Sequence, residues 1–183
     1  MAVETASRLL GELDLVPGDT LLVSGASGGI GSMVVQFANQ RGLKVIGTAS
    51  REKLELLHGL GAIPTPYGPG LVERVKSLSP RGVDGVLDIA GSGIILELIE
   101  LAGDPARVVS AADFSAPQYG ARISLVAQKH PEIVLAEALR LSSQGLLRVA
   151  PVKQFPLDRV AEAYTLCSEG HSGKVVINLA GVQ

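Results

Sequence analysis

The stretch from Leu21 to Gly31 reads LLVSGASGGIG, an apolar run followed by small residues that leave little but backbone for contact. A strand that leads through a glycine turn into a helix directs free N–H groups and the positive end of the helix dipole at one place, which suits a phosphate. Ala26, Gly28 and Gly31 have the spacing of the dinucleotide fingerprint, with alanine in place of its first glycine. No lysine followed by serine or threonine closes the motif, which argues against a phosphate-loop NTPase. We therefore predict a dinucleotide site; the alternative is a purely structural glycine turn.

The end of the next apolar strand indicates which dinucleotide is bound. A carboxylate at this place would hold the hydroxyls of the adenosine ribose, but the sequence reads GTASREK, with no acidic residue before Glu52. Ser50, Arg51 and Lys53 are instead available to a 2′-phosphate. This pattern favours NADP over NAD. The alternative is that the two basic residues form only a solvated first turn of a helix.

The elements that position these residues alternate between short β-branched runs and segments of helical period, which is typical of βαβ units and a parallel sheet. We expect a doubly wound, Rossmann-type α/β fold with a mostly parallel sheet of about six strands and helices on both faces. The strand candidates are TLLVS from Thr20, KVIGT from Lys44, VDGVLDI from Val83, ARVVS from Ala106, ARISLVA from Ala121 and KVVINL from Lys174. The predicted helices are 30–40, 52–60, 71–78, 94–101, 131–143 and 158–168.

Composition sets the limits on domain number and on partners. With 183 residues, 46% of them hydrophobic, we expect a single nucleotide-binding domain, with a lead-in helix in 1–16, a core in 20–112 and strand–helix units in 120–183. A formal net charge of −2 without runs of like charge argues against nucleic-acid or membrane partners. The N-terminus lacks a signal-peptide pattern, which favours a cytoplasmic protein. The single cysteine, Cys167, excludes an internal disulfide and is expected to pack within a helix.

Two families of dehydrogenase share the glycine pattern. SGASGGIG fits the short-chain dehydrogenases, which place glycine at positions 25, 29 and 31. That family performs its chemistry with a tyrosine and a lysine four residues later. The three tyrosines here are followed at that spacing by Leu71, Ile123 and Ser168. A short-chain reductase that lacks this pair is therefore the less favoured alternative.

The remainder of the chain resembles the medium-chain dehydrogenase/reductases, and within them the zinc-independent branch similar to quinone oxidoreductases. The resemblance runs nearly from end to end. It rests on several segments in the right order: LDLVPGDTLLVSGASGGIGSMVVQFANQRGLKVIGTAS, LLHGLGA, GVDGVLDIAGSG, ARVVSAADF, QFPLDRVAEAY and HSGKVVINLAG.

The resemblance implies a set of cofactor-binding residues and no metal site. It implies that the pyrophosphate is bound by Ala26, Ser27, Gly28, Gly29, Ile30 and Gly31. The 2′-phosphate would lie near Ser50, Arg51 and Lys53, with Tyr67 beside it, and the nicotinamide side would be flanked by Asp88, Gly91, Ser110 and Ala112. Tyr67 could alternatively lie on the surface of a proline-rich loop, and Asp88 could bond only to local N–H groups.

The implied function is that of the NADPH-binding domain of an oxidoreductase that transfers hydride to a quinone, an enone or a related carbonyl compound. A complete member begins with a barrel-like catalytic domain, whereas this chain opens at the helix that follows it, so we expect the chain alone to be inactive and name no catalytic residue. The alternative is an NADP-binding redox-sensing or structural module without turnover. The segment YGARISLVAQ resembles an edge strand that pairs across a two-fold axis, which implies a homodimer.

Overall fold

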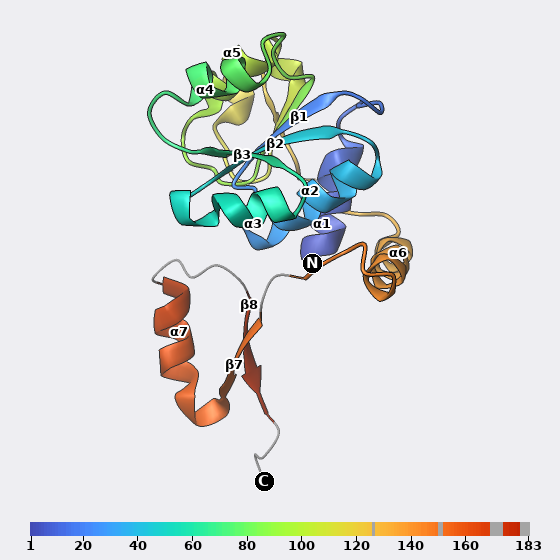
Figure 1. The fold of residues 1–183 in the computed structure, drawn as a ribbon, viewed down its shortest axis with the longest axis vertical. Coiled ribbons are helices and arrows are strands. Elements are labelled where there is room, and N and C mark those ends of the chain that lie inside the picture. The colour runs from blue at the N-terminus through green and yellow to red at the C-terminus, as the bar shows by residue number, and fades with distance from the viewer. Residues whose placement is uncertain (126, 150–151, 169–173, 180–183) are drawn as a thin grey trace. The chain divides into compact units, whose positions relative to one another are not determined.

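The computed structural model describes residues 1–125, 127–149, 152–168 and 174–179 (Figure 1). The chain divides into two compact units, Met1–Leu147 and Arg148–Gln183. The assignment of all 183 residues to one nucleotide-binding domain stays a prediction. No helix among the described residues is long and apolar enough to cross a membrane.

The first unit is built on a six-stranded sheet in the order β3-β2-β1-β4-β5-β6, and every neighbouring pair of strands is parallel. The strands are β1 Thr20–Ser24, β2 Lys44–Ala49, β3 Ile63–Pro66, β4 Gly85–Asp88, β5 Val108–Ser110 and β6 Arg122–Ile123. The chain order reverses between β1 and β4, which is the switch point where doubly wound sheets bind ligands. This topology confirms the predicted fold class.

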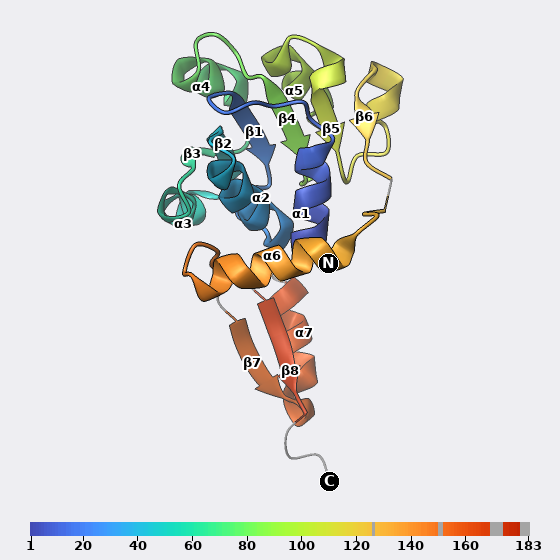
Figure 2. The ribbon, with the colours of Figure 1, turned by 90° about the vertical axis from the view of Figure 1, so that its right-hand side faces the viewer.

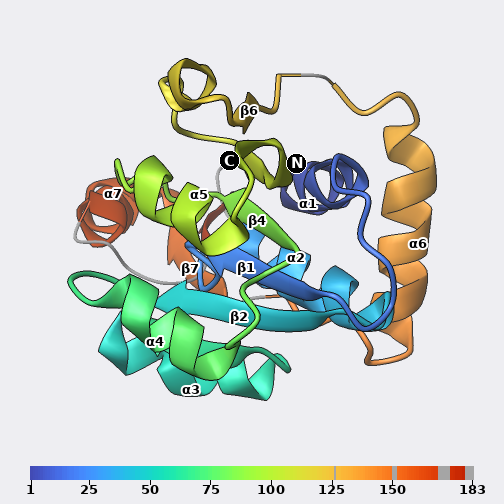
Figure 3. The same cartoon turned by 90° about the horizontal axis from the view of Figure 1, so that it is seen from above.

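Helices cover both faces of the sheet, as predicted. They are α1 Ala2–Gly11, α2 Gly29–Gln40, α3 Leu54–Gly59, α4 Leu71–Leu78, α5 Ile95–Ala102 and α6 Pro131–Ser143. Figure 1 shows α4 and α5 on one side of the sheet and α1, α2 and α3 on the other. Successive residues of β1 point to opposite faces, because Leu21 and Val23 belong to the buried cluster with α1 and α2, and Leu22 to the cluster with α4 and α5. Figures 2 and 3 show α6 beside α1, and its Ala138 and Leu141 join the first cluster.

The strands that make up the sheet are not all those predicted. The sheet has six strands, but one of them is β3, Ile63–Pro66, which is not among the strand candidates and lies directly before Tyr67 in a proline-rich stretch. Pro64 and Pro66 are tolerated because β3 is an edge strand, where one side needs no N–H donors. At the other edge β6 has two residues, Arg122–Ile123, and not the predicted run of 121–127, in which Val126 lies outside the described residues.

The second unit contains the parallel strands β7 Val152–Pro156 and β8 Lys174–Asn178, with the helix α7 Val160–Ser168 between them in the chain. The prediction that residues from Lys174 form a strand is confirmed. Their expected place in the six-stranded sheet is wrong, because β8 pairs with β7. The expected packing role of Cys167 is also wrong, since this side chain is exposed on α7.

Candidate dinucleotide-binding site

The glycine loop after β1 is tied to the neighbouring strand β2. Gly25 has a φ of 77°, in the left-handed region that glycine adopts readily. Its N–H donates to the Thr48 hydroxyl at 3.0 Å, and the N–H of Ala26 donates to the Thr48 carbonyl at 3.0 Å. The left-handed turn is therefore made at Gly25, one residue before the fingerprint position occupied by Ala26. Thr48 is a residue of the site that the sequence analysis missed.

A glycine on β2 explains why alanine can stand at the first fingerprint position. Ala26 is fully buried, and a Cβ atom placed on Gly47 would lie 2.8 Å from the Cβ atom of Ala26. Real Cβ atoms do not approach so closely, so the methyl group of Ala26 occupies the space that a side chain at position 47 would need.

Gly31 brings α2 directly onto the loop. A Cβ atom at this position would lie 2.3 Å from the Gly25 carbonyl oxygen and 2.7 Å from the Ala26 Cα atom, so no other residue type fits here without a shift of the backbone. Gly28 and Gly29 differ from Gly31 in being exposed. A Cβ atom at Gly28 would make an ordinary 3.4 Å contact with the Gly25 carbonyl oxygen, and one at Gly29 would meet nothing within 4 Å. The loop is thus packed on its inner side and open on its outer side.

The start of α2 offers hydrogen-bond donors at this open side. The N-cap Gly28 has no side chain to cap the helix, and the N–H groups of Gly29, Ile30 and Gly31 have no acceptor among the described residues. The first N–H groups of a helix need acceptors from outside it, and the helix dipole favours negative charge there. The glycine cradle and the uncapped helix end therefore fit the diphosphate of a dinucleotide.

The turn after β2 carries the residues predicted for the 2′-phosphate. Arg51, Glu52 and Lys53 form a short 3₁₀ helix, and Arg51 is exposed without a carboxylate partner among the described residues. The Ser50 hydroxyl donates to the Glu52 carboxylate at 3.3 Å. Glu52 therefore puts a negative charge into the same turn, which reduces but does not cancel its positive character.

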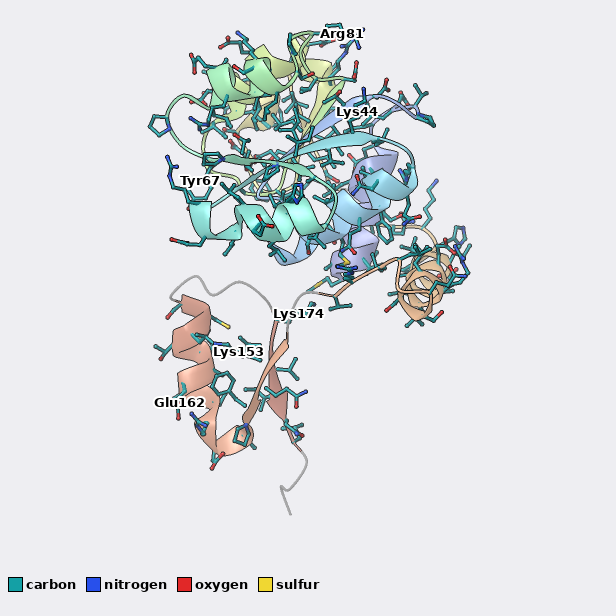
Figure 4. All side chains as sticks on the ribbon, viewed as in Figure 1. Lys44, Tyr67, Arg81, Lys153, Glu162 and Lys174 are labelled. Carbon is teal, nitrogen blue, oxygen red and sulfur yellow. The ribbon has the colours of Figure 1, made fainter. Side chains whose placement is uncertain are left out.

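Tyr67 lies next to this turn. Its N–H donates to the carbonyl of Ala49, the last residue of β2, at 3.2 Å. Its side chain is 62% exposed. Figure 4 shows Tyr67 near the carboxyl end of β2, where α3 begins, whereas Lys44, at the start of β2, lies at the opposite end of that strand. The structure thus brings together Tyr67 and the residues 50–53, as expected, while its surface exposure also agrees with the alternative of a solvated loop tyrosine.

Asp88 and Ser110 connect the ends of β4 and β5. Asp88 is 2% exposed, and its two carboxylate oxygens accept hydrogen bonds from the Ser110 hydroxyl at 2.8 Å and from the Gly91 N–H at 3.1 Å. The Ser110 oxygen in turn accepts from the N–H groups of Ala112 at 3.2 Å and Asp113 at 2.8 Å. The bond from the Gly91 N–H agrees with the alternative in which Asp88 bonds to local N–H groups, and the Ser110 hydroxyl adds a partner from the next strand.

The loops after β4 and β5 touch one another through Gly91 and Ala112. Gly91 has a φ of 58°, and a Cβ atom there would lie 2.7 Å from the Cβ atom of Ala112. Hydrogen bonds from the hydroxyl and the N–H of Ser115 lower the pKa of Asp113, which keeps this carboxylate ionised at the end of the second loop. All four residues predicted for the nicotinamide side therefore meet at one place beside the switch point. Among the described residues there is no group of three or more His, Cys, Asp or Glu side chains that could hold a metal ion.

Known proteins resemble this chain in fold and in sequence. The chain is 31% identical to the NADPH-dependent alkenal/one oxidoreductase of Arabidopsis thaliana over 97% of its length, and 30% identical to a pikromycin polyketide synthase component of Streptomyces venezuelae over 91% of it. It spans 45% of the first relative and 5% of the second. The solved quinone oxidoreductase of Coxiella burnetii matches with a TM-score of 0.78 and 27% identity, over 98% of this chain and 58% of that one.

The family model described as zinc-binding dehydrogenase matches residues 29–132, which include α2, the turn after β2 and the ends of β4 and β5. The fold, the glycine loop and these comparisons agree: the chain belongs to this family, as a cofactor-binding domain of the medium-chain dehydrogenase/reductases.

Proposed function

We propose that this chain is the NADPH-binding part of an oxidoreductase that transfers hydride to a quinone, an enone or a related carbonyl compound. The observation that carries the proposal is the start of α2, where the N–H groups of Gly29, Ile30 and Gly31 lack acceptors among the described residues and the exposed residues of the loop are the two glycines Gly28 and Gly29. This end of the helix lies at the switch point of the sheet, where a dinucleotide fits.

The preference for NADPH is supported by the turn after β2. Arg51 and Lys53 carry positive charge there, and Tyr67 is bonded to the last residue of the strand. A 2′-phosphate is the only charged group by which NADPH differs from NADH, so a basic turn at this place favours NADPH.

The chemistry of the proposed reaction comes from the cofactor, because NADPH supplies the hydride when it is bound. The residues of this chain bind and orient it. The backbone of residues 26–31 takes the diphosphate, and the network of Asp88 and Ser110 fixes the loops with Gly91 and Ala112 on the nicotinamide side. The substrate class is supported by the names of an alkenal/one oxidoreductase and a quinone oxidoreductase among the similar proteins. The zinc-independent branch is proposed from the resemblance of the quoted segments.

Isothermal titration of the purified chain with NADPH and with NADH tests the proposal. We expect both cofactors to bind, with NADPH favoured by ten- to about a hundredfold, because a partly exposed charge-assisted contact contributes roughly 1.5 to 3 kcal/mol. Absence of binding of either cofactor would overturn the proposal, and equal affinities would overturn its NADPH part.

We also propose that this chain alone does not turn over substrate, since it spans only 45% of the alkenal/one oxidoreductase that it resembles and hydride transfer needs a cofactor site closed to water. Steady-state assays with NADPH over a panel of quinones and α,β-unsaturated ketones measure this. Saturable turnover above about one per second, the lower end of typical enzyme rates, would contradict it.

A homodimer is proposed through the edge of the sheet at β6. This edge strand is short, and Leu125 just beyond it is 69% exposed, so pairing with a second copy would cover unpaired backbone and apolar surface. Light scattering should give the mass of a dimer. A monomer at high protein concentration would show that the edge is protected in another way.

A further inference from the structure

Arg74, on α4, binds the loop that carries Tyr67. Its guanidinium donates to the carbonyl oxygens of Pro66 at 2.8 Å, Gly68 at 3.0 Å and Pro69 at 2.7 Å. These residues belong to the loop Pro66–Gly70, which connects β3 to α4. One side chain therefore holds three carbonyls of a five-residue stretch that contains Tyr67.

The loop has few other means to hold its shape. Residues 67–70 are exposed, Gly68 and Gly70 have φ values of 91° and 79°, and its two prolines lack an N–H donor. The bond from the Tyr67 N–H to Ala49 joins the loop to β2 at one end. Without Arg74, the loop would be free to sample many conformations, because fixing each residue costs about 1 to 2 kcal/mol of entropy.

The guanidinium is committed to this loop. Arg74 has no carboxylate within ion-pair distance among the described residues, and its Nε atom is buried without a hydrogen-bond partner. An unpaired buried donor costs free energy. In this geometry Nε has no partner, but the two terminal nitrogens of the guanidinium both donate to carbonyl oxygens of the loop.

We propose that Arg74 is a positioning residue for NADPH, which fixes the loop Pro66–Gly70 so that Tyr67 is presented to the turn Ser50–Lys53 before the cofactor binds. The proposal rests on the proposed function, in which this turn takes the 2′-phosphate. A preformed loop raises affinity because the complex no longer bears the cost of ordering it. Arg74 acts through Tyr67 and needs no contact of its own with the cofactor.

The test compares Arg74→Ala and Arg74→Lys with Lys76→Ala, a control that removes a positive charge from the same helix, where Lys76 pairs with Glu100 at 2.6 Å. Titration with NADPH should show about tenfold weaker binding for both Arg74 variants and unchanged binding for Lys76→Ala. Lysine keeps the charge but cannot span three carbonyls, so it should not restore affinity. Binding of NADH should change less than twofold, which a general loss of folding would not produce.

A double-mutant cycle with Tyr67→Ala shows whether Arg74 acts through the tyrosine. Tyr67→Ala should weaken NADPH binding, and Arg74→Lys should add little in that background. Hydrogen exchange of the Tyr67 N–H in the free protein should also be faster in Arg74→Lys than in the wild type. The exchange measurement on Arg74→Lys tests whether Arg74 orders the loop even if Arg74→Ala does not fold.

The outcomes separate this inference from the function on which it rests. A wild-type chain that binds neither cofactor overturns both. NADPH binding that is unchanged in Arg74→Lys, that falls equally with NADH, or that falls independently of Tyr67, overturns the role of Arg74 and leaves the NADPH site intact.

Discussion

The glycine loop and the turn after β2 follow neighbouring strands, but the loop offers backbone groups to a ligand and the turn offers side chains. In the loop, backbone atoms are fixed by packing: Gly31 contacts the Gly25 carbonyl, and Thr48 holds Gly25 and Ala26. In the turn, the charged side chains of Arg51 and Lys53 belong to a short 3₁₀ helix, none of whose residues is buried. Packing gives the loop one shape that any dinucleotide would meet. The turn offers charge on side chains that are not buried, so it can discriminate between cofactors at little cost to the fold.

The largest expected effect comes from adding a methyl group on the packed side of the loop. Gly31→Ala places a Cβ atom 2.3 Å from the Gly25 carbonyl oxygen, so we expect the free energy of unfolding to fall by about 3 kcal/mol. Gly29→Ala is the matched control in the same helix, because its Cβ atom meets nothing, and it should stay within about 0.5 kcal/mol of the wild type. Denaturant unfolding measures both. Equal stability of the two variants would show that the loop is not fixed by packing.

A change on the open side of the loop should affect binding and leave the fold intact. Gly28 has φ −76° and ψ 176°, which valine can adopt, and its Cβ position is free of clashes. Gly28→Val should therefore unfold like the wild type but weaken NADPH and NADH alike, by about a hundredfold, since its methyl groups fill the space in front of the uncapped helix. Titration with each cofactor checks this. Unchanged affinities would place the diphosphate elsewhere.

The smallest expected effect is selective. Arg51→Ala should weaken NADPH by about tenfold, leave NADH nearly unchanged and reduce the salt dependence of NADPH binding. Lys44→Ala is the control, because it removes an exposed positive charge at the opposite end of β2 (Figure 4). Titration at two salt concentrations gives the comparison. If Arg51→Ala weakens the binding of both cofactors equally, the turn after β2 does not bind the 2′-phosphate.

The sequence predicted those features that depend on residues close together in the chain. Helices α4 and α6 have the expected bounds, 71–78 and 131–143, because apolar period and a glycine or proline at the start define them locally. The glycine loop, the helix after it and the fold class were also predicted. Strand β3 was missed, since its prolines are unfavourable in a strand unless that strand is at an edge, and edge position is a property of the whole sheet.

The contacts that give the site its shape were not predictable in this way. Thr48 holds the glycine loop, 22 to 23 residues earlier in the chain, which only the pairing of β1 with β2 brings to it. Arg74 is close in the chain to the carbonyls that it binds, but no recognised sequence pattern indicates that contact. The exposure of Cys167 and the pairing of β8 with β7 were also missed, because the helical and strand patterns identify an element but not its neighbours. The binding roles of the predicted site residues stay predictions that the variants above test.

The contact between Ala26 and Gly47 restricts the order in which these positions can change during evolution. A methyl group at position 47 would lie 2.8 Å from that of Ala26, the nearest atom that it would meet. A descendant that first replaced Ala26 by glycine would gain the standard fingerprint and free the space for alanine at position 47. The same two substitutions in the reverse order would pass through an overpacked intermediate. Related sequences should therefore carry a methyl group at one of these two positions and seldom at both.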